Sequence, residues 1–128
     1  MDLLFILGRL VFGGFFLIKG VEHFKNKEGL VGYAKSKGIE KADTAVIGTG
    51  VMMILGGLGI VLGTFVQVAF GLIILFLVPT SIMMHAYWKE TDGGKKMNEK
   101  ISFMSNMALA GAALMMLANM PGPWTWGL

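Results

Sequence analysis

Long apolar stretches separated by short polar ones dominate the pattern of this chain. Four of them are long and apolar enough to be membrane-spanning helices, since a helix needs about 20 mostly apolar residues to cross a bilayer. They cover residues 3–23, 45–62, 65–88 and 101–119. They lack the alternation of polar and apolar residues that marks the strands of a membrane barrel. We therefore predict an all-α fold, a four-transmembrane-helix bundle that forms a single integral membrane domain over residues 1–128.

The composition is that of a membrane protein, and it excludes chemistry that depends on cysteine. The chain is 55% hydrophobic and only 15% charged, whereas soluble domains carry about 25% charged residues. It has no cysteine, which excludes disulfides, thiolate metal ligands and thiol redox chemistry by this chain alone. His23 and His85 are the only imidazoles. We therefore expect no metal site.

The basic residues predict an orientation. Of the 11 lysines and arginines, five lysines lie in residues 24–44 and four in residues 89–100. Spans two and three are joined by the uncharged pair Gly63-Thr64. Because lysine and arginine accumulate in cytoplasmic loops, the two basic loops are predicted to be cytoplasmic and both termini to face outward. The lysines are then explained by membrane topology and by contacts with anionic lipids, and we expect no nucleic-acid partner.

The first basic loop has an amphipathic pattern of its own. Leu30, Val31, Tyr33 and Ala34 stand among lysines, and Gly38 follows them. This spacing predicts a short interfacial helix in the first cytoplasmic loop that ends near Gly38. A disordered basic loop is the alternative interpretation.

Polar residues inside the spans are the candidate functional residues, because charges at that depth are costly and usually mark a site, a partner or snorkelling. The residues near the cytoplasmic ends of their spans form a predicted inner cluster: Glu22, His23, His85, Ser102 and Asn106. Those near the outer ends form a predicted outer cluster: Arg9, Gln67 and Asn119. Gln67 and His85 share one face, since 18 residues make five helical turns.

Structural explanations compete with the functional ones at most of these positions. Glu22 and His23 also fit an interfacial location, and His85 also fits a hydrogen-bonded histidine in the core. Asn106 also fits an amide bond between helices. Arg9 lies about 9 Å inside its span and either snorkels outward, binds an anionic or electron-rich group, or pairs with a partner subunit.

Several spaced motifs resemble the DoxX family of small four-helix membrane proteins. The first is Arg9-x3-Gly13-x2-Phe16-x3-Gly20-x2-His23-Phe24. Later pieces are Tyr33, Gly38, Gly56-Gly57, Gly63, Met84-His85-Ala86-Tyr87-Trp88 and Phe103-x2-Asn106-x-Ala108-Leu109-x-Gly111. Their order and spacing extend over nearly the whole chain.

The resemblance implies a multi-pass protein of the prokaryotic inner (cytoplasmic) membrane that is associated with redox systems. One branch of the family resembles a subunit of thiosulfate:quinone oxidoreductase. Many members carry an acidic residue in span two, but this chain has none between Ala45 and Gly63. Proton-coupled chemistry deep in the bundle is therefore disfavoured.

Three hypotheses for function remain open. The first is a redox-associated subunit that contacts quinone or a membrane oxidoreductase complex. Its candidate cofactor-binding residues are Arg9, His23, His85 and Asn106, with Glu22, Ser102 and Gln67. The second is a non-catalytic scaffold or accessory subunit of a larger membrane complex. The third is haem b held by the two histidines, the minimum for bis-axial ligation.

The expected partners are the lipid bilayer and either other membrane subunits or further copies of the chain. Quinone is the one cofactor that the first hypothesis suggests. The sequence assigns no catalytic residue and leaves open whether the protein is an enzyme.

Overall fold

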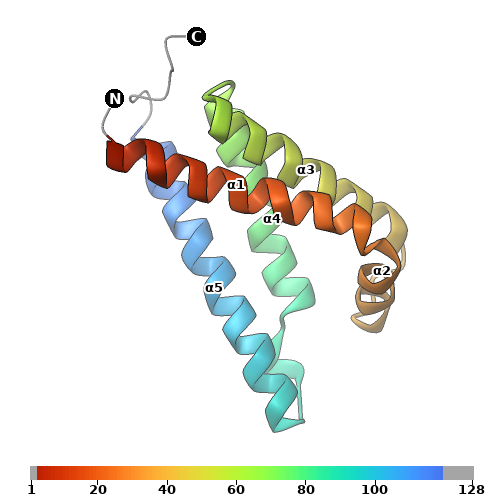
Figure 1. Cartoon of the computed structure of the whole chain (residues 1–128). Coiled ribbons are helices and arrows are strands. Elements are labelled where there is room, and N and C mark those ends of the chain that lie inside the picture. Colours follow the sequence, from red (N-terminus) through yellow and green to blue (C-terminus); the bar gives the residue numbers. More distant parts are fainter. Residues whose placement is uncertain (1–2, 120–128) are drawn as a thin grey trace.

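The computed structural model describes residues 3–119, which fold into helices joined by short turns (Figure 1). The elements are α1 (Leu3–Lys25), α2 (Lys27–Ser36), α3 (Ala42–Leu62), α4 (Val66–Met84), η1 (Tyr87–Lys89) and α5 (Gly93–Ala118). Four segments have the length and hydropathy of membrane spans, namely α1, α3, α4 with η1, and α5. The all-α, four-span prediction is confirmed. The orientation stays a prediction.

The spans pack as two pairs that diverge from one end of the molecule. α1 lies along α3, and α4 lies along α5, while α3 and α4 are joined by a tight turn (Figure 1). The main core lies where the pairs meet. Its buried residues include Phe16, Met53, Ile60, Phe70, Ile73, Ala110 and Ala113. Away from that core the pairs separate, toward the end that carries α2 and η1 (Figure 1).

Glycines bring α1 and α3 into backbone contact. A Cβ atom placed on Gly57 would lie 2.6 Å from the amide nitrogen of Leu17 and 2.7 Å from the carbonyl oxygen of Gly13. One placed on Gly20 would lie 2.9 Å from the carbonyl oxygen of Gly50. Small residues permit such close approach between membrane helices. The α1–α3 contact therefore has no room for side chains at these positions.

The uncharged hairpin between α3 and α4 depends on two residues with left-handed backbone. Gly63 ends α3 with φ 71°, and Phe65 precedes α4 with φ 49°. The amide of Thr64 donates to the carbonyl of Gly59 at 3.0 Å. Glycine adopts this conformation without steric conflict, so the chain reverses within three residues.

The two basic loops are more ordered than their composition suggests. The short helix expected in the first loop is present as α2, which is followed by Gly38 with φ +85°. In the second loop, α5 begins at Gly93, well before the predicted span at residue 101. The Asp92 carboxylate accepts a hydrogen bond from the amide of Lys95 at 3.0 Å and so caps this extension.

Candidate functional site

A sharp turn after α4 brings His85 opposite Glu99. α4 ends at Met84, and the chain then forms η1 instead of continuing as helix to residue 88. Tyr87, Trp88 and Phe103 pack edge to face, with ring centroids 5.3–5.5 Å apart, and hold η1 against α5. As a result His85 Nδ1 lies 3.1 Å from Glu99 Oε2.

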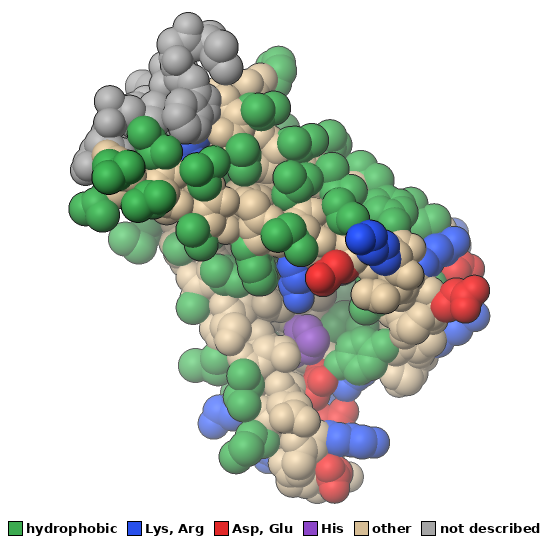
Figure 2. Space-filling view, in the orientation of Figure 1, with side chains coloured by type: hydrophobic (Ala, Val, Ile, Leu, Met, Phe, Trp, Pro, Cys, Tyr) green, Lys and Arg blue, Asp and Glu red, His purple; other side chains and the backbone are tan. Residues whose placement is uncertain are grey.

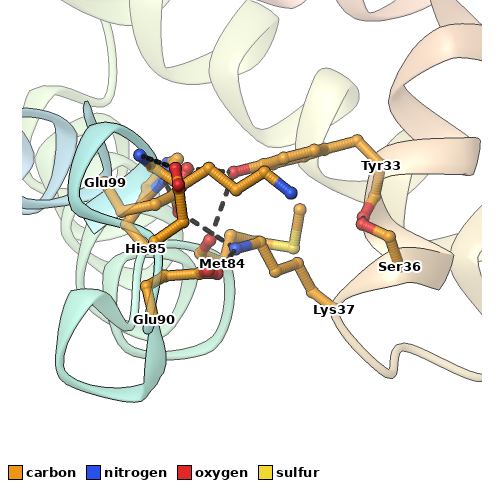
Figure 3. Close-up of polar contacts among 9 residues, drawn as sticks. Tyr33, Ser36, Lys37, Met84, His85, Glu90 and Glu99 are labelled. Atoms are coloured by element: carbon orange, nitrogen blue, oxygen red, sulfur yellow. Dashed lines mark hydrogen bonds and ion pairs between the residues drawn. The ribbon is translucent and has the colours of Figure 1, made fainter. Parts of the chain in front are cut away.

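Glu99 is the centre of a polar cluster that joins three parts of the chain (Figure 3). The Tyr33 hydroxyl donates to Glu99 Oε1 at 2.5 Å. Lys37 Nζ lies 3.3 Å from Glu99 Oε2 and 3.0 Å from Glu90 Oε1. We call Tyr33, Lys37, His85, Glu90 and Glu99 the polar cluster. It connects α2 to the α4–α5 pair at the end where the two pairs of spans separate.

Tyr33 of α2 and Lys37, the residue that follows α2, face this cluster together because four residues make about one helical turn. Val31 and Ala34 of α2 are buried, and they pack against Ala42 and Val46 of α3. This small apolar contact anchors α2 on α3. The polar side chains of α2 then extend to α4 and α5 (Figure 3).

The pKa of both Lys37 and Tyr33 is raised in the polar cluster. The hydrogen bond from Lys37 to Glu90, together with the one to Glu99, raises the pKa of the Lys37 ammonium despite partial burial. Burial, and then the hydrogen bond to Glu99, raises the pKa of the Tyr33 hydroxyl. Glu90 and Glu99 thus share one lysine, and Glu99 also contacts His85.

His23 lies in different surroundings from His85. It is half-buried on α1, and its Nδ1 lies 3.0 Å from the carbonyl oxygen of Lys19. Its ring stands edge-on to Phe76 of α4, with centroids 6.1 Å apart. The contacts of His85 are instead to Glu99 and to the ring of Tyr33, 6.5 Å away. Haem ligation by both histidines stays a prediction, and only the two Nε2 atoms are available for it.

Arg9 has a structural contact at the opposite end of the bundle. Its side chain is buried, 2% exposed, and Nε donates to the carbonyl oxygen of Ile60 at 2.8 Å. Ile60 lies in the last turn of α3, where carbonyls lack intrahelical partners. A cation is favourable there because the C-terminal end of a helix carries partial negative charge. This contact explains how a charge is accommodated deep in span one.

The other predicted site residues are distributed over the bundle. Glu22 and Gln67 are exposed, on α1 and in the first turn of α4. Ser102 and Asn106 are half-buried on α5. Asn106 lies two turns beyond Glu99 on the same face of the helix, since seven residues return to nearly the same direction. The structure thus adds Glu99 to the α5 face that the sequence assigned to Ser102 and Asn106.

Four members of the polar cluster were absent from the residues predicted from sequence: Tyr33, Lys37, Glu90 and Glu99. All four lie in the stretches assigned to loops, where charged residues were attributed to topology. One signal was present for Glu99. If the helix of span four is extended back to the capping residue Asp92, Glu99 falls on the same face as Asn106.

The surface of the bundle is hollowed where charged side chains gather (Figure 2). Figure 2 shows basic, acidic and histidine side chains gathered in the hollowed region between α1 and α5, while hydrophobic side chains cover most of the spans. Within residues 3–119, no three histidine, aspartate or glutamate side chains come together to hold a metal ion. The arrangement is suited to hydrogen bonding with a polar headgroup at the end of an apolar bundle.

Fold and site together define a small multi-pass membrane protein with a polar cluster at one end of a four-helix bundle. The DoxX family model matches residues 4–86. The chain belongs to the DoxX family. The inner membrane protein YphA of Escherichia coli (strain K12) is 30% identical over 119 residues, covering 93% of this chain and 84% of the relative. No solved structure matches the chain.

Proposed function

We propose that this protein is a redox-associated subunit of a prokaryotic inner membrane that binds the headgroup of a quinone or quinol. The name of the E. coli relative supports this location. The redox association is the one that resemblance to DoxX proteins implies. Because the chain has no cysteine, we expect the redox centre to belong to a partner oxidoreductase subunit.

One observation carries the proposal: a partly exposed imidazole is held by a carboxylate at the end of apolar helices. The His85 side chain is 18% exposed and lies 3.1 Å from Glu99. Quinones carry two ring oxygens and a long apolar tail, and such ligands bind where a few polar groups meet apolar walls. Hydrophobic side chains cover the spans around the hollow (Figure 2).

The candidate residues take different parts in this proposal. His85 hydrogen-bonds one oxygen of the headgroup, and Asn106 lies deeper along α5 for the second. His23 and Glu22 would contribute from α1, and Ser102 from the α5 face that carries Glu99 and Asn106. Arg9 and Gln67 lie near the Gly63-Thr64 turn at the opposite end of the bundle, so they do not contact this headgroup.

Thermal unfolding of the purified protein tests the proposal. Short-chain ubiquinone and menaquinone analogues, added in their oxidised and reduced forms, should raise the Tm of the wild type. His85→Ala should reduce that rise, whereas Gln67→Ala, an exposed position at the far end, should keep it. A wild-type Tm that no analogue changes would contradict quinone binding.

A scaffold or accessory subunit is the second candidate, and the exposed helix faces favour it. In the most apolar 18-residue stretch of α5, only 11% is buried within the chain. In the corresponding stretch of α1, 22% is buried. Lipid, another subunit or a second copy of the chain covers such faces in a membrane. Isolation in a mild detergent tests this, since recovery as a lone, stable monomer would count against a scaffold.

A further inference from the structure

We propose that Glu99 is a positioning residue that keeps the proton of neutral His85 on Nδ1, so that Nε2 accepts a hydrogen bond from a ligand hydroxyl. The inference rests on the proposed quinone site and deepens it. It makes the reduced quinol, whose hydroxyl groups donate, the preferred ligand over the quinone, whose carbonyl oxygens only accept.

The hydrogen-bond inventory around Glu99 fixes the direction of each bond. An ionised carboxylate is an acceptor only, so a nitrogen 3.1 Å from Oε2 must carry the hydrogen. Neutral imidazole has one protonated nitrogen. His85 Nδ1 is therefore the donor, and Nε2 keeps its lone pair.

The neighbours of Glu99 keep it in the accepting form. The Tyr33 hydroxyl donates to Oε1, and the Lys37 ammonium lies 3.3 Å from Oε2 beside the imidazole. Both donors stabilise a carboxylate rather than a carboxylic acid. Glu90 contacts only Lys37 among these residues. It therefore serves as a control, a carboxylate of the same cluster that does not contact the His85 imidazole.

His85 Nε2 is the atom left for a ligand. Within residues 3–119 the structure gives this nitrogen no hydrogen-bond partner, and the side chain is partly exposed. The Tyr33 ring lies 6.5 Å away at a tilt of 37° and forms part of the surroundings. A hydroxyl that approaches Nε2 gains a hydrogen bond, whereas a carbonyl oxygen there faces a lone pair. One such bond corresponds to a preference of about tenfold in Kd.

Nitrogen-15 NMR of histidine-labelled protein in detergent tests the positioning directly. His85 is assigned with the variant His23→Gln. In the wild type, neutral His85 should carry its proton on Nδ1. In Glu99→Ala that preference should be lost, whereas Glu90→Ala should keep it. His23, whose Nδ1 donates to a backbone carbonyl, should remain unchanged in both and serves as an internal reference.

Equilibrium binding of a short-chain ubiquinol and of the matching ubiquinone, under anaerobic conditions, tests the ligand. Wild type and Glu90→Ala should bind the quinol about tenfold more tightly, and Glu99→Ala should bind both forms alike. If Glu99→Ala does not fold, Glu99→Gln replaces it and should reduce the preference.

The outcomes separate this inference from the proposed function. A wild-type His85 protonated on Nε2, or a tautomer unchanged in Glu99→Ala, overturns the role of Glu99 even if quinol binds. Equal affinity of the wild type for both forms overturns the preference for quinol. Failure of both forms to bind overturns the proposed function, and the quinol preference with it.

Discussion

The α1–α3 contact and the polar cluster hold the same bundle together by opposite means. At the first, glycines such as Gly13 and Gly57 bring backbone against backbone, and an added Cβ would lie within 3 Å of backbone atoms. At the second, side chains of 13–25% exposure make hydrogen bonds and ion pairs across a separation between helices. Backbone contact leaves no alternative arrangement, whereas polar side chains can exchange their partners. The polar end is therefore the place where a ligand can be admitted.

The largest effect is expected from filling the α1–α3 contact. Gly57→Ala places a methyl group 2.6 Å from the amide nitrogen of Leu17, and we expect it to lower the free energy of unfolding by about 2–3 kcal/mol. Gly48→Ala on the same helix is the matched control, because no atom beyond the neighbouring backbone of α3 lies within 4 Å of its new Cβ. Denaturant or thermal unfolding in detergent measures both. Equal stability of the two variants would contradict a contact made by backbone.

Removing the buried cation Arg9 should have the next largest effect on stability. Arg9→Leu deprives the carbonyl of Ile60 of its donor, and a buried acceptor without a partner costs about 2 kcal/mol. Lys19→Met, an exposed cation on the same helix, should change stability little. The same unfolding measurement applies. An unchanged stability of Arg9→Leu would show that the end of α3 does not need this cap.

The polar cluster should respond more weakly and locally. Glu99→Ala removes the acceptor of Tyr33, Lys37 and His85, and we expect a loss of about 1 kcal/mol because the groups are partly exposed. Glu90→Ala should lose less than about 0.5 kcal/mol. Hydrogen exchange should quicken in α2 and leave α1 and α3 protected. Quicker exchange spread evenly over all the helices would contradict the contrast between the polar cluster and the α1–α3 contact.

The smallest effect concerns alkaline pH. The pKa values of Tyr33 and Lys37 are raised above their ordinary values of 10.0 and 10.5. A group whose pKa is higher in the folded state binds its proton more tightly there. Its stabilisation is complete below the unfolded pKa and is lost as the pH rises through the folded one. The Tm should therefore fall above about pH 10.

Variants of the same two residues separate this effect from general alkaline unfolding. The double variant Tyr33→Phe with Lys37→Met should show a smaller fall of Tm between neutral and strongly alkaline pH than the wild type. Lys35→Met, an exposed lysine of α2, should behave as the wild type does. A fall of the same size in the double variant would show that Tyr33 and Lys37 do not cause the loss of stability at alkaline pH.

Much of the fold could be predicted because the bilayer constrains it strongly. The apolar stretches predicted the four spans, and the amphipathic spacing near Tyr33 predicted α2. The candidate site was predicted only in part. Of the polar cluster, His85 alone was among the candidate site residues predicted from sequence. Glu99, Tyr33 and Lys37 were attributed to loops, because hydropathy stops at the edge of the span and says nothing of helices that continue beyond it.

The sequence by itself determined how many helices cross the membrane and which of them carry polar groups, since burial in lipid requires long apolar helices with satisfied backbone. Only the tertiary structure decided which polar groups meet. It pairs Arg9 with the end of α3, and His85 with Glu99. These partners are 51 and 14 residues apart in the sequence. Pairing over such separations depends on where the helices turn and how closely glycines let them approach, and neither follows from the pattern along one helix.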